Sequence, residues 1–190
     1  MRLTALFPHW RGLRVMHVCA ECDHLTLFAE AISRAACCPR CHRPSRAVHS
    51  RYQRRVADLP CGGRAVTLVL HARRFFCRAP DCSQQTFAER LTTLVAPGAR
   101  RSHAFDAALT RIGAALGGKS GARLARHLAM PTSDDTLLRL VRAMPLPVAA
   151  PAQVLGVDDW AWTKGRRYGT ILCDLERHCA VRVPSGWHPA

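Results

Sequence analysis

The chain of 190 residues carries 28 basic and 13 acidic side chains, and its formal net charge of +15 favours polyanionic partners such as nucleic acid. With 48% hydrophobic and 22% charged residues, the composition excludes a disordered or fibrous protein. No apolar run reaches the roughly 20 residues of a membrane span, and the apolar stretch at residues 3–7 is too short for a signal peptide. We therefore predict a cytoplasmic protein without a membrane partner.

Shifts in composition divide the chain into four parts. Residues 1–92 hold eight of the ten cysteines and are predicted to form a zinc-binding β domain. Residues 93–144 are rich in Ala, Leu and Arg and are predicted to form a helical domain. Residues 145–152 form a Pro/Ala linker, and residues 153–190 form a last segment with strand-like patterning.

Three short strands are predicted in the first part. Residues 13–18 and 25–29 are apolar runs on either side of a polar turn. Residues 65–72 alternate with the period of two that marks a strand, and they follow a Gly62-Gly63 turn.

The cysteine spacing predicts one structural zinc site. A C-x2-C pair and a C-x4-C pair, 35 residues apart, offer four thiolates from two knuckles, which suits tetrahedral zinc. The predicted ligands are Cys38, Cys41, Cys77 and Cys82. Other sets remain open, because Cys37 adjoins the first pair, Cys19 and Cys22 form another C-x2-C pair, and Cys61 lies between the knuckles; His42 and His49 are substitute ligands.

Basic residues interleave with aromatic ones between the knuckles, a pattern that suits phosphate contact and stacking but is also typical of a solvated strand face. The candidates for DNA contact in this stretch are Arg51, Arg54, Arg55, Arg73 and Arg74.

Three helices are predicted in the second part. Residues 103–116 place apolar side chains on one helical face, and Gly117-Gly118 is expected to end that helix. Residues 120–130 repeat the pattern, and Ser133 is a suitable N-cap for a third helix, 133–144. This predicts a three-helix helix-turn-helix domain, whose DNA-facing residues would be Ser133, Thr136, Arg139 and Arg142.

The last part contains an apolar run that ends in two carboxylates, Asp158 and Asp159, followed by a second strand at residues 168–175. A carboxylate on the first strand of an antiparallel hairpin is how RNase H-like nucleases begin a two-metal site. The plainer interpretation is that the Asp pair forms a turn.

Taken in order, these landmarks resemble the ISL-three family of insertion-sequence transposases. The resemblance is carried by Cys38-Pro39-Arg40-Cys41, His49-Ser50-Arg51-Tyr52, Asp58-Leu59-Pro60, Arg73-Arg74-Phe75-Phe76-Cys77, Cys82, Thr86-Phe87-Ala88-Glu89-Arg90, Asp135-Thr136-Leu137-Leu138-Arg139, Gly156-Val157-Asp158-Asp159, Tyr168-Gly169-Thr170 and Asp174-Leu175-Glu176. It implies an α+β protein: a zinc-binding N-terminal domain, a helix-turn-helix and the first β-hairpin of an RNase H-like DDE domain that uses Mg²⁺. Asp158 would be the first catalytic carboxylate, with Asp159 as the alternative.

The family pattern would continue beyond Arg177 to a second Asp and a Glu, whereas residues 180–190 depart from it. We therefore expect a C-terminally truncated transposase that binds double-stranded DNA at the terminal inverted repeats without cleaving it. The alternative is a DNA-binding regulator or repressor of transposition. Self-association into a homo-oligomer is compatible with either interpretation.

Overall fold

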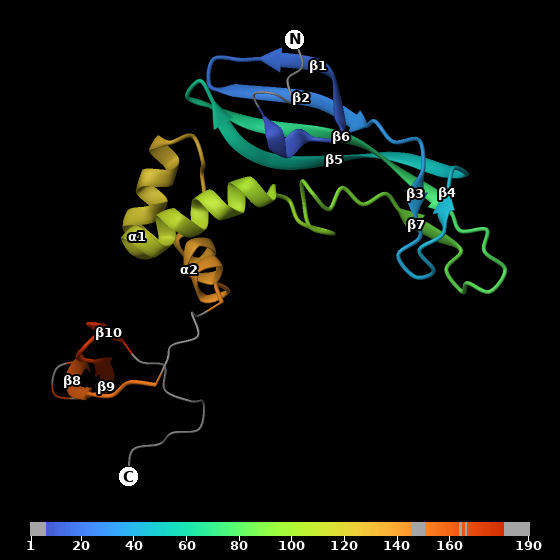
Figure 1. Ribbon diagram of the computed structural model, residues 1–190. Coiled ribbons are helices and arrows are strands. Elements are labelled where there is room, and N and C mark those ends of the chain that lie inside the picture. The colour runs from blue at the N-terminus through green and yellow to red at the C-terminus, as the bar shows by residue number, and fades with distance from the viewer. Residues whose placement is uncertain (1–6, 146–150, 164, 166, 181–190) are drawn as a thin grey trace. The chain divides into compact units, whose positions relative to one another are not determined.

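The computed structural model describes residues 7–145, 151–163, 165 and 167–180 (Figure 1). The chain divides into two compact units, Met1–Met144 and Pro145–Ala190, and each contains its own β-sheet. Among the described residues, no helix is both long and apolar enough to cross a membrane.

The first unit is built on a five-stranded sheet in which β1, β2, β6 and β5 lie side by side in that order and β7 pairs with β6 (Figure 1). The hairpins β1–β2 and β5–β6 are antiparallel, whereas β2 and β6 run parallel. All three strands expected from the sequence are present, and each is longer than expected. The strands are β1 (Leu13–Ala20), β2 (His24–Ala31), β5 (Val48–Cys61), β6 (Arg64–Phe76) and β7 (Thr86–Ala88).

A two-residue turn of glycines closes the long β5–β6 hairpin. Gly62 has a φ of 59° and Gly63 a φ of 75°, the left-handed backbone that two-residue hairpin turns with the right twist require. A side chain at either position would strain the backbone. The turn pairs Cys61 with Arg64, and a register shift between Asp58 and Cys61 then sets the pairing of Val56 of β5 with Leu68 of β6.

One face of the sheet carries the main hydrophobic core. Val66, Leu68 and Leu70 of β6 are buried there, as alternation along a strand requires. Trp10, from the short 3-10 helix Pro8–Trp10, packs in the same cluster. Leu94 and Val95 belong to it as well, so segments before and after the sheet cover this face.

Two helices follow the sheet. α1 (His103–His127) begins at Ser102 and α2 (Asp134–Arg142) begins at Ser133, and in each case the serine hydroxyl accepts a hydrogen bond from the backbone N–H three residues later. The N-cap expected at Ser133 is therefore present. The two helices pack closely at Gly121 of α1, which has no side chain. An ideal Cβ at this position would lie only 2.8 Å from Cδ1 of Leu137 in α2.

The predicted three-helix helix-turn-helix domain is wrong. The described residues contain two α-helices besides the short 3-10 helix, and strands dominate the fold. The helix that starts at His103 is interrupted at Gly117, as expected, because Gly117 adopts the non-helical values φ 69° and ψ −165°; helical geometry then resumes, and the two arms are counted together as α1. The segment expected at 103–116 is thus the first arm of α1, and the segment expected at 120–130 lies in the second arm, which ends at His127; the bend between the arms is visible in Figure 1.

A buried carboxylate joins the sheet to the helices. Asp58 of β5 is 1% exposed and accepts hydrogen bonds from Trp10 Nε1 and from the hydroxyl of Ser102, the α1 N-cap. His9 Nε2 lies 2.9 Å from the same carboxylate. Ser102 is itself anchored to β5, since its backbone N–H donates to the carbonyl of Ala57. This Asp58 junction therefore sets where α1 starts relative to the sheet.

The second unit contains a three-stranded antiparallel sheet of order β10-β9-β8. Its strands are β8 (Leu155–Thr163), β9 (Arg167–Asp174) and β10 (Cys179–Ala180). The expected hairpin is thus formed, but a meander of three strands is common to many folds. An RNase H-like domain remains a prediction for this unit.

Candidate metal centre

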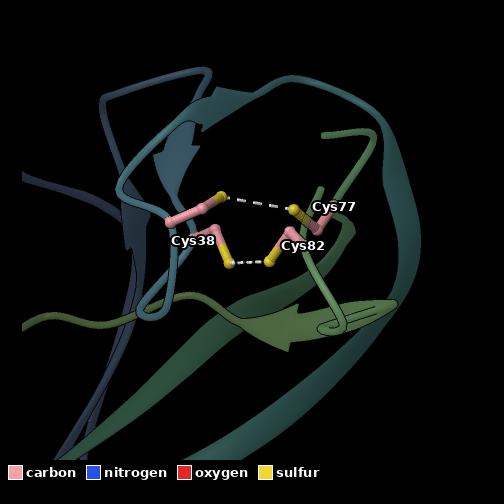
Figure 2. Close-up of side chains that lie close together, drawn as sticks. Cys38, Cys77 and Cys82 are labelled. Atoms are coloured by element: carbon pink, nitrogen blue, oxygen red, sulfur yellow. Dashed lines mark hydrogen bonds between the residues drawn. The ribbon is translucent and has the colours of Figure 1, made fainter. Parts of the chain in front are cut away.

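Four cysteine side chains converge at one end of the β5–β6 hairpin. Cys38 and Cys41 come from the turn between two short paired strands, β3 (Ala36–Cys37) and β4 (Pro44–Ser45). Cys77 and Cys82 come from the loop that follows β6. Their four sulfur atoms all lie within 4.8 Å of one another. Figure 2 shows the first knuckle, with Cys38, facing Cys77 and Cys82 of the second.

The spacing of the sulfurs fits a tetrahedral zinc ion. Four sulfurs bound to zinc at about 2.3 Å stand about 3.8 Å apart. The Sγ atoms of Cys38 and Cys82 are 3.9 Å apart, and those of Cys41 and Cys77 are 3.6 Å apart (Figure 2). All four predicted ligands therefore come together as structural zinc requires.

Backbone hydrogen bonds give each knuckle its shape. In the first, the N–H of His42 donates to the carbonyl of Cys38, while the N–H of Cys38 donates to the carbonyl of Arg43. His42 has a φ of 58°, because the chain must reverse immediately after Cys41. In the second, the N–H of Cys77 donates to the carbonyl of Gln85. The ligands are held by turns rather than by long strands.

A small apolar cluster supports the sulfurs. Cys38 and Phe75 are fully buried, and Phe75 stacks on Phe87 with ring centroids 5.8 Å apart. Phe75 lies two residues before Cys77, and Phe87 lies on β7, which pairs with β6. The rings exclude water from one side of the site, and this strengthens the attraction between thiolates and a cation.

The metal-free thiols cannot ionise together easily. Burial raises the pKa of Cys38, but hydrogen bonds from the backbone N–H groups of Cys41 and Arg40 and from neighbouring thiols outweigh it and lower that pKa to about 7. The backbone N–H of Ala79 lowers the pKa of Cys77, yet burial and its cysteine neighbours raise it to about 12. A divalent cation removes this conflict, because it stabilises every thiolate at once.

The other cysteines stand apart from this site. In the described part of the chain, neither Cys19 and Cys22 at the β1–β2 turn nor Cys61 at the end of β5 joins a cluster of three or more metal-binding groups. Cys19 Sγ contacts His17 Nε2 at 3.1 Å, a pair too small to hold a metal firmly. His49, a substitute ligand in the sequence, instead contacts the hydroxyl of Ser50.

The fold and the four-sulfur cluster define a zinc ribbon, in which two knuckles hold one structural ion. Residues 34–85 match a family model described as the zinc-finger of transposase IS204/IS1001/IS1096/IS1165, and the match spans all four ligands. This part of the chain is thus similar to the zinc ribbon of an ISL-three type transposase, which suggests an insertion-sequence transposase. No curated protein and no solved structure matches the chain.

The structure separates the arginines proposed to contact DNA into two groups. Arg51, Arg55 and Arg74 are exposed on β5 and β6. Arg54 instead donates to the carbonyls of Ala96 and Ala99. Arg73 forms an ion pair with Glu89 and also donates to the carbonyl of Ser33. The side chains of Arg54 and Arg73 therefore support neighbouring loops.

The α2 candidates are placed at both ends of that helix. The hydroxyl of Ser133 accepts from the N–H of Thr136, and Thr136 is buried. Arg139 donates to the hydroxyl of Thr136 from an exposed position, and Arg142 is exposed in the last turn. The serine and threonine thus shape the helix start, while the two arginines face solvent.

The carboxylate candidate Asp158 is exposed on β8, opposite Ile171 of β9. The side chain of Asp159 lies outside the described residues. Asp174, at the end of β9, is buried and accepts hydrogen bonds from the N–H groups of Glu176 and Arg177. Asp174 therefore acts as a turn former, and no described acidic group joins Asp158 in a cluster of three metal-binding groups.

Sequence reasoning missed two features. The Asp58 junction is invisible in the sequence because the partners of Asp58 lie 44 to 49 residues away. A set of arginines around the zinc ligands was also passed over. The signal was present, since Arg40, Arg43, Arg46 and Arg78 lie within five residues of a ligand cysteine.

Proposed function

We propose that the chain recognises double-stranded DNA at the terminal inverted repeats of an insertion sequence, as the DNA-binding part of a transposase, and that zinc is required for this binding. The observation that carries the proposal is the four-cysteine zinc ribbon whose residues 34–85 match the transposase zinc-finger model. The net charge of +15 supports it, because phosphate contacts dominate affinity for DNA.

The zinc in this proposal has a structural role. Four thiolate ligands fill the tetrahedral coordination sphere and leave no position for a reacting water molecule. The ion instead links the β3–β4 turn to the loop after β6, two segments that are separated in the sequence by the β5–β6 hairpin. Loss of the ion is expected to release both loops and the basic residues that they carry.

Exposed arginines on both parts of the first unit supply the contacts. Arg51, Arg55 and Arg74 extend from the sheet, and Arg139 and Arg142 extend from α2. Phosphate contacts of this kind position a protein on the duplex, whereas base contacts specify sequence. The proposal therefore assigns these five side chains to the DNA backbone, and it assigns Arg54 and Arg73 to loop support.

The second unit contributes a narrower expectation. If it forms an RNase H-like domain, Asp158, with Asp159 as the alternative, would hold Mg²⁺; the carboxylate of Asp158 is exposed on β8. Self-association of two chains, each bound to one end of the insertion sequence, is compatible with the proposal. The size of the protein–DNA complex tests it.

The test is a mobility shift on a duplex from the ends of the element that encodes the chain, with a shuffled duplex of equal length beside it. Cys38→Ser removes a ligand, and Cys19→Ser is the matched control because Cys19 lies outside the cluster. We expect bound zinc and preference for the end duplex in the wild type and in Cys19→Ser, and loss of both in Cys38→Ser or after chelation.

Equal affinity of the wild type for the two duplexes would refute recognition of the ends. Undiminished binding by the zinc-free protein would refute the role of the metal. For both conclusions, the zinc content of every sample must be measured directly, by atomic emission.

A further inference from the structure

A concave surface beside the zinc site is lined almost entirely by the two loops that hold the metal. It has a volume of about 380 Å³, and its walls are residues 43–47 after the first knuckle and residues 77–79 of the second. The lining includes the ligand Cys77 itself. We call this surface the arginine groove, after Arg43, Arg46 and Arg78.

The charge of the arginine groove is uniformly positive. All three arginines are exposed, and no acidic residue lines the surface. Within the two ligand loops, residues 36–48 and 77–85, Asp81 is the one acidic residue. No carboxylate among the described residues forms an ion pair with these guanidinium groups, whereas Arg14, Arg73 and Arg101 elsewhere in the unit are paired. Three cations without counter-ions around a hollow favour an anionic ligand.

Phosphate is the anion that suits these groups best. A guanidinium group offers planar, paired N–H donors that match phosphate oxygens. Ser45 also lines the groove, and its hydroxyl accepts a hydrogen bond from the N–H of Ala47. The groove also leads into the basic part of β5, because Ala47 lines it and β5 begins at Val48. Farther along β5, Arg51 and Arg55 are both exposed and, at four residues' separation, lie on one face of the strand about 13 Å apart.

We propose that the arginine groove binds a backbone phosphate of DNA and that zinc assembles it from two separate loops. The inference rests on the proposed DNA binding and names a surface that contacts the duplex. Its zinc dependence follows from the connectivity. Arg78 directly follows the ligand Cys77, and the carbonyl of Arg43 accepts the N–H of the ligand Cys38 at 3.0 Å.

The test compares two variants of equal charge. Arg46→Ala with Arg78→Ala removes two groove arginines, and Arg11→Ala with Arg64→Ala removes two arginines outside it, from the loop after Trp10 and from the first residue of β6. Each full-length variant is checked for zinc content and is titrated with the end duplex and with the shuffled duplex at several salt concentrations.

We expect the groove variant to bind both duplexes about tenfold more weakly, with the slope of log affinity against log salt reduced by about one, because the groove holds one phosphate and each lost phosphate contact removes about 0.9. The control variant is expected to stay close to the wild type in both quantities. Equal loss in the two variants would show that only net charge matters, and it would overturn the groove.

The outcomes separate this inference from the proposed function. If the groove variant binds like the control, the groove is refuted while recognition of the ends stands. If the wild type does not prefer the end duplex but the groove variant still loses affinity, recognition fails and the groove stands. Binding of inorganic phosphate to the wild type, with DNA affinity unchanged in the groove variant, would assign the groove to a free anion and refute the inference. Absence of binding to either duplex would overturn both proposals.

Discussion

Replacing Asp58 tests whether the sheet and the helices are joined by a single carboxylate. In Asp58→Ala, the Trp10 indole N–H and the Ser102 hydroxyl, both within buried residues, lose their acceptor. An unsatisfied buried donor costs about 1–3 kcal/mol, and His9 adds less because it is partly exposed, so the expected loss is about 3–5 kcal/mol in the free energy of unfolding.

Asp58→Asn is expected to cost less, about 1–2 kcal/mol, because one amide oxygen can still accept from Trp10 and His9. The amide nitrogen would then face Ser102, whose hydroxyl can reverse and accept. The assay is urea unfolding followed by circular dichroism in the presence of zinc. Glu21→Ala, an exposed acidic position at the β1–β2 turn, is a control expected to change stability by less than about 0.5 kcal/mol. A loss below about 1 kcal/mol in Asp58→Ala would refute the reasoning.

Three further substitutions test the packing around the site. Phe75→Ala removes the ring beneath the sulfurs; we expect about 3–5 kcal/mol of lost stability by thermal unfolding and weaker zinc retention against a chelator, and unchanged retention would contradict the supporting role. Glu89→Gln leaves Arg73 without its ion pair and is expected to cost about 2–3 kcal/mol, a little below a fully buried pair, since Arg73 keeps some contact with water. Gly121→Ala pushes a methyl group against Leu137, and the urea midpoint should fall by the equivalent of about 1 kcal/mol, because overpacking exceeds the gain in helix propensity; a higher midpoint would show that the helices can separate freely.

The metal site was predictable because its information is local. Two knuckles with short internal spacing specify their own turns, so Cys38, Cys41, Cys77 and Cys82 could be chosen before any fold was known. The same holds for residues 65–72, whose alternation lies within β6, and for the N-cap at Ser133. Each of these depends on neighbours within a few residues.

Features that depend on distant partners were not predictable. Arg54 and Arg73 have the same local sequence pattern as Arg51 and Arg74. Their roles differ because folding brings the carbonyl of Ala96 to Arg54 and the carboxylate of Glu89 to Arg73. The interruption at Gly117 does follow its local signal, but the packing of both arms of α1 against α2 depends on residues that are distant in the sequence.

The parallel pairing of β2 with β6 gives the zinc site a kinetic consequence. The segment between these strands, residues 32–63, contains the first knuckle, and the second knuckle follows β6 directly. A chain must close this long loop before the parallel pairing forms, and slow closure of nonlocal pairings limits folding rates. An ion that binds both knuckles early holds the two ends of β5–β6 together and reduces the conformations that the chain samples before β2 pairs with β6. Refolding in the presence of zinc should therefore be faster as well as more complete, which makes the metal an organiser of the order in which the strands assemble.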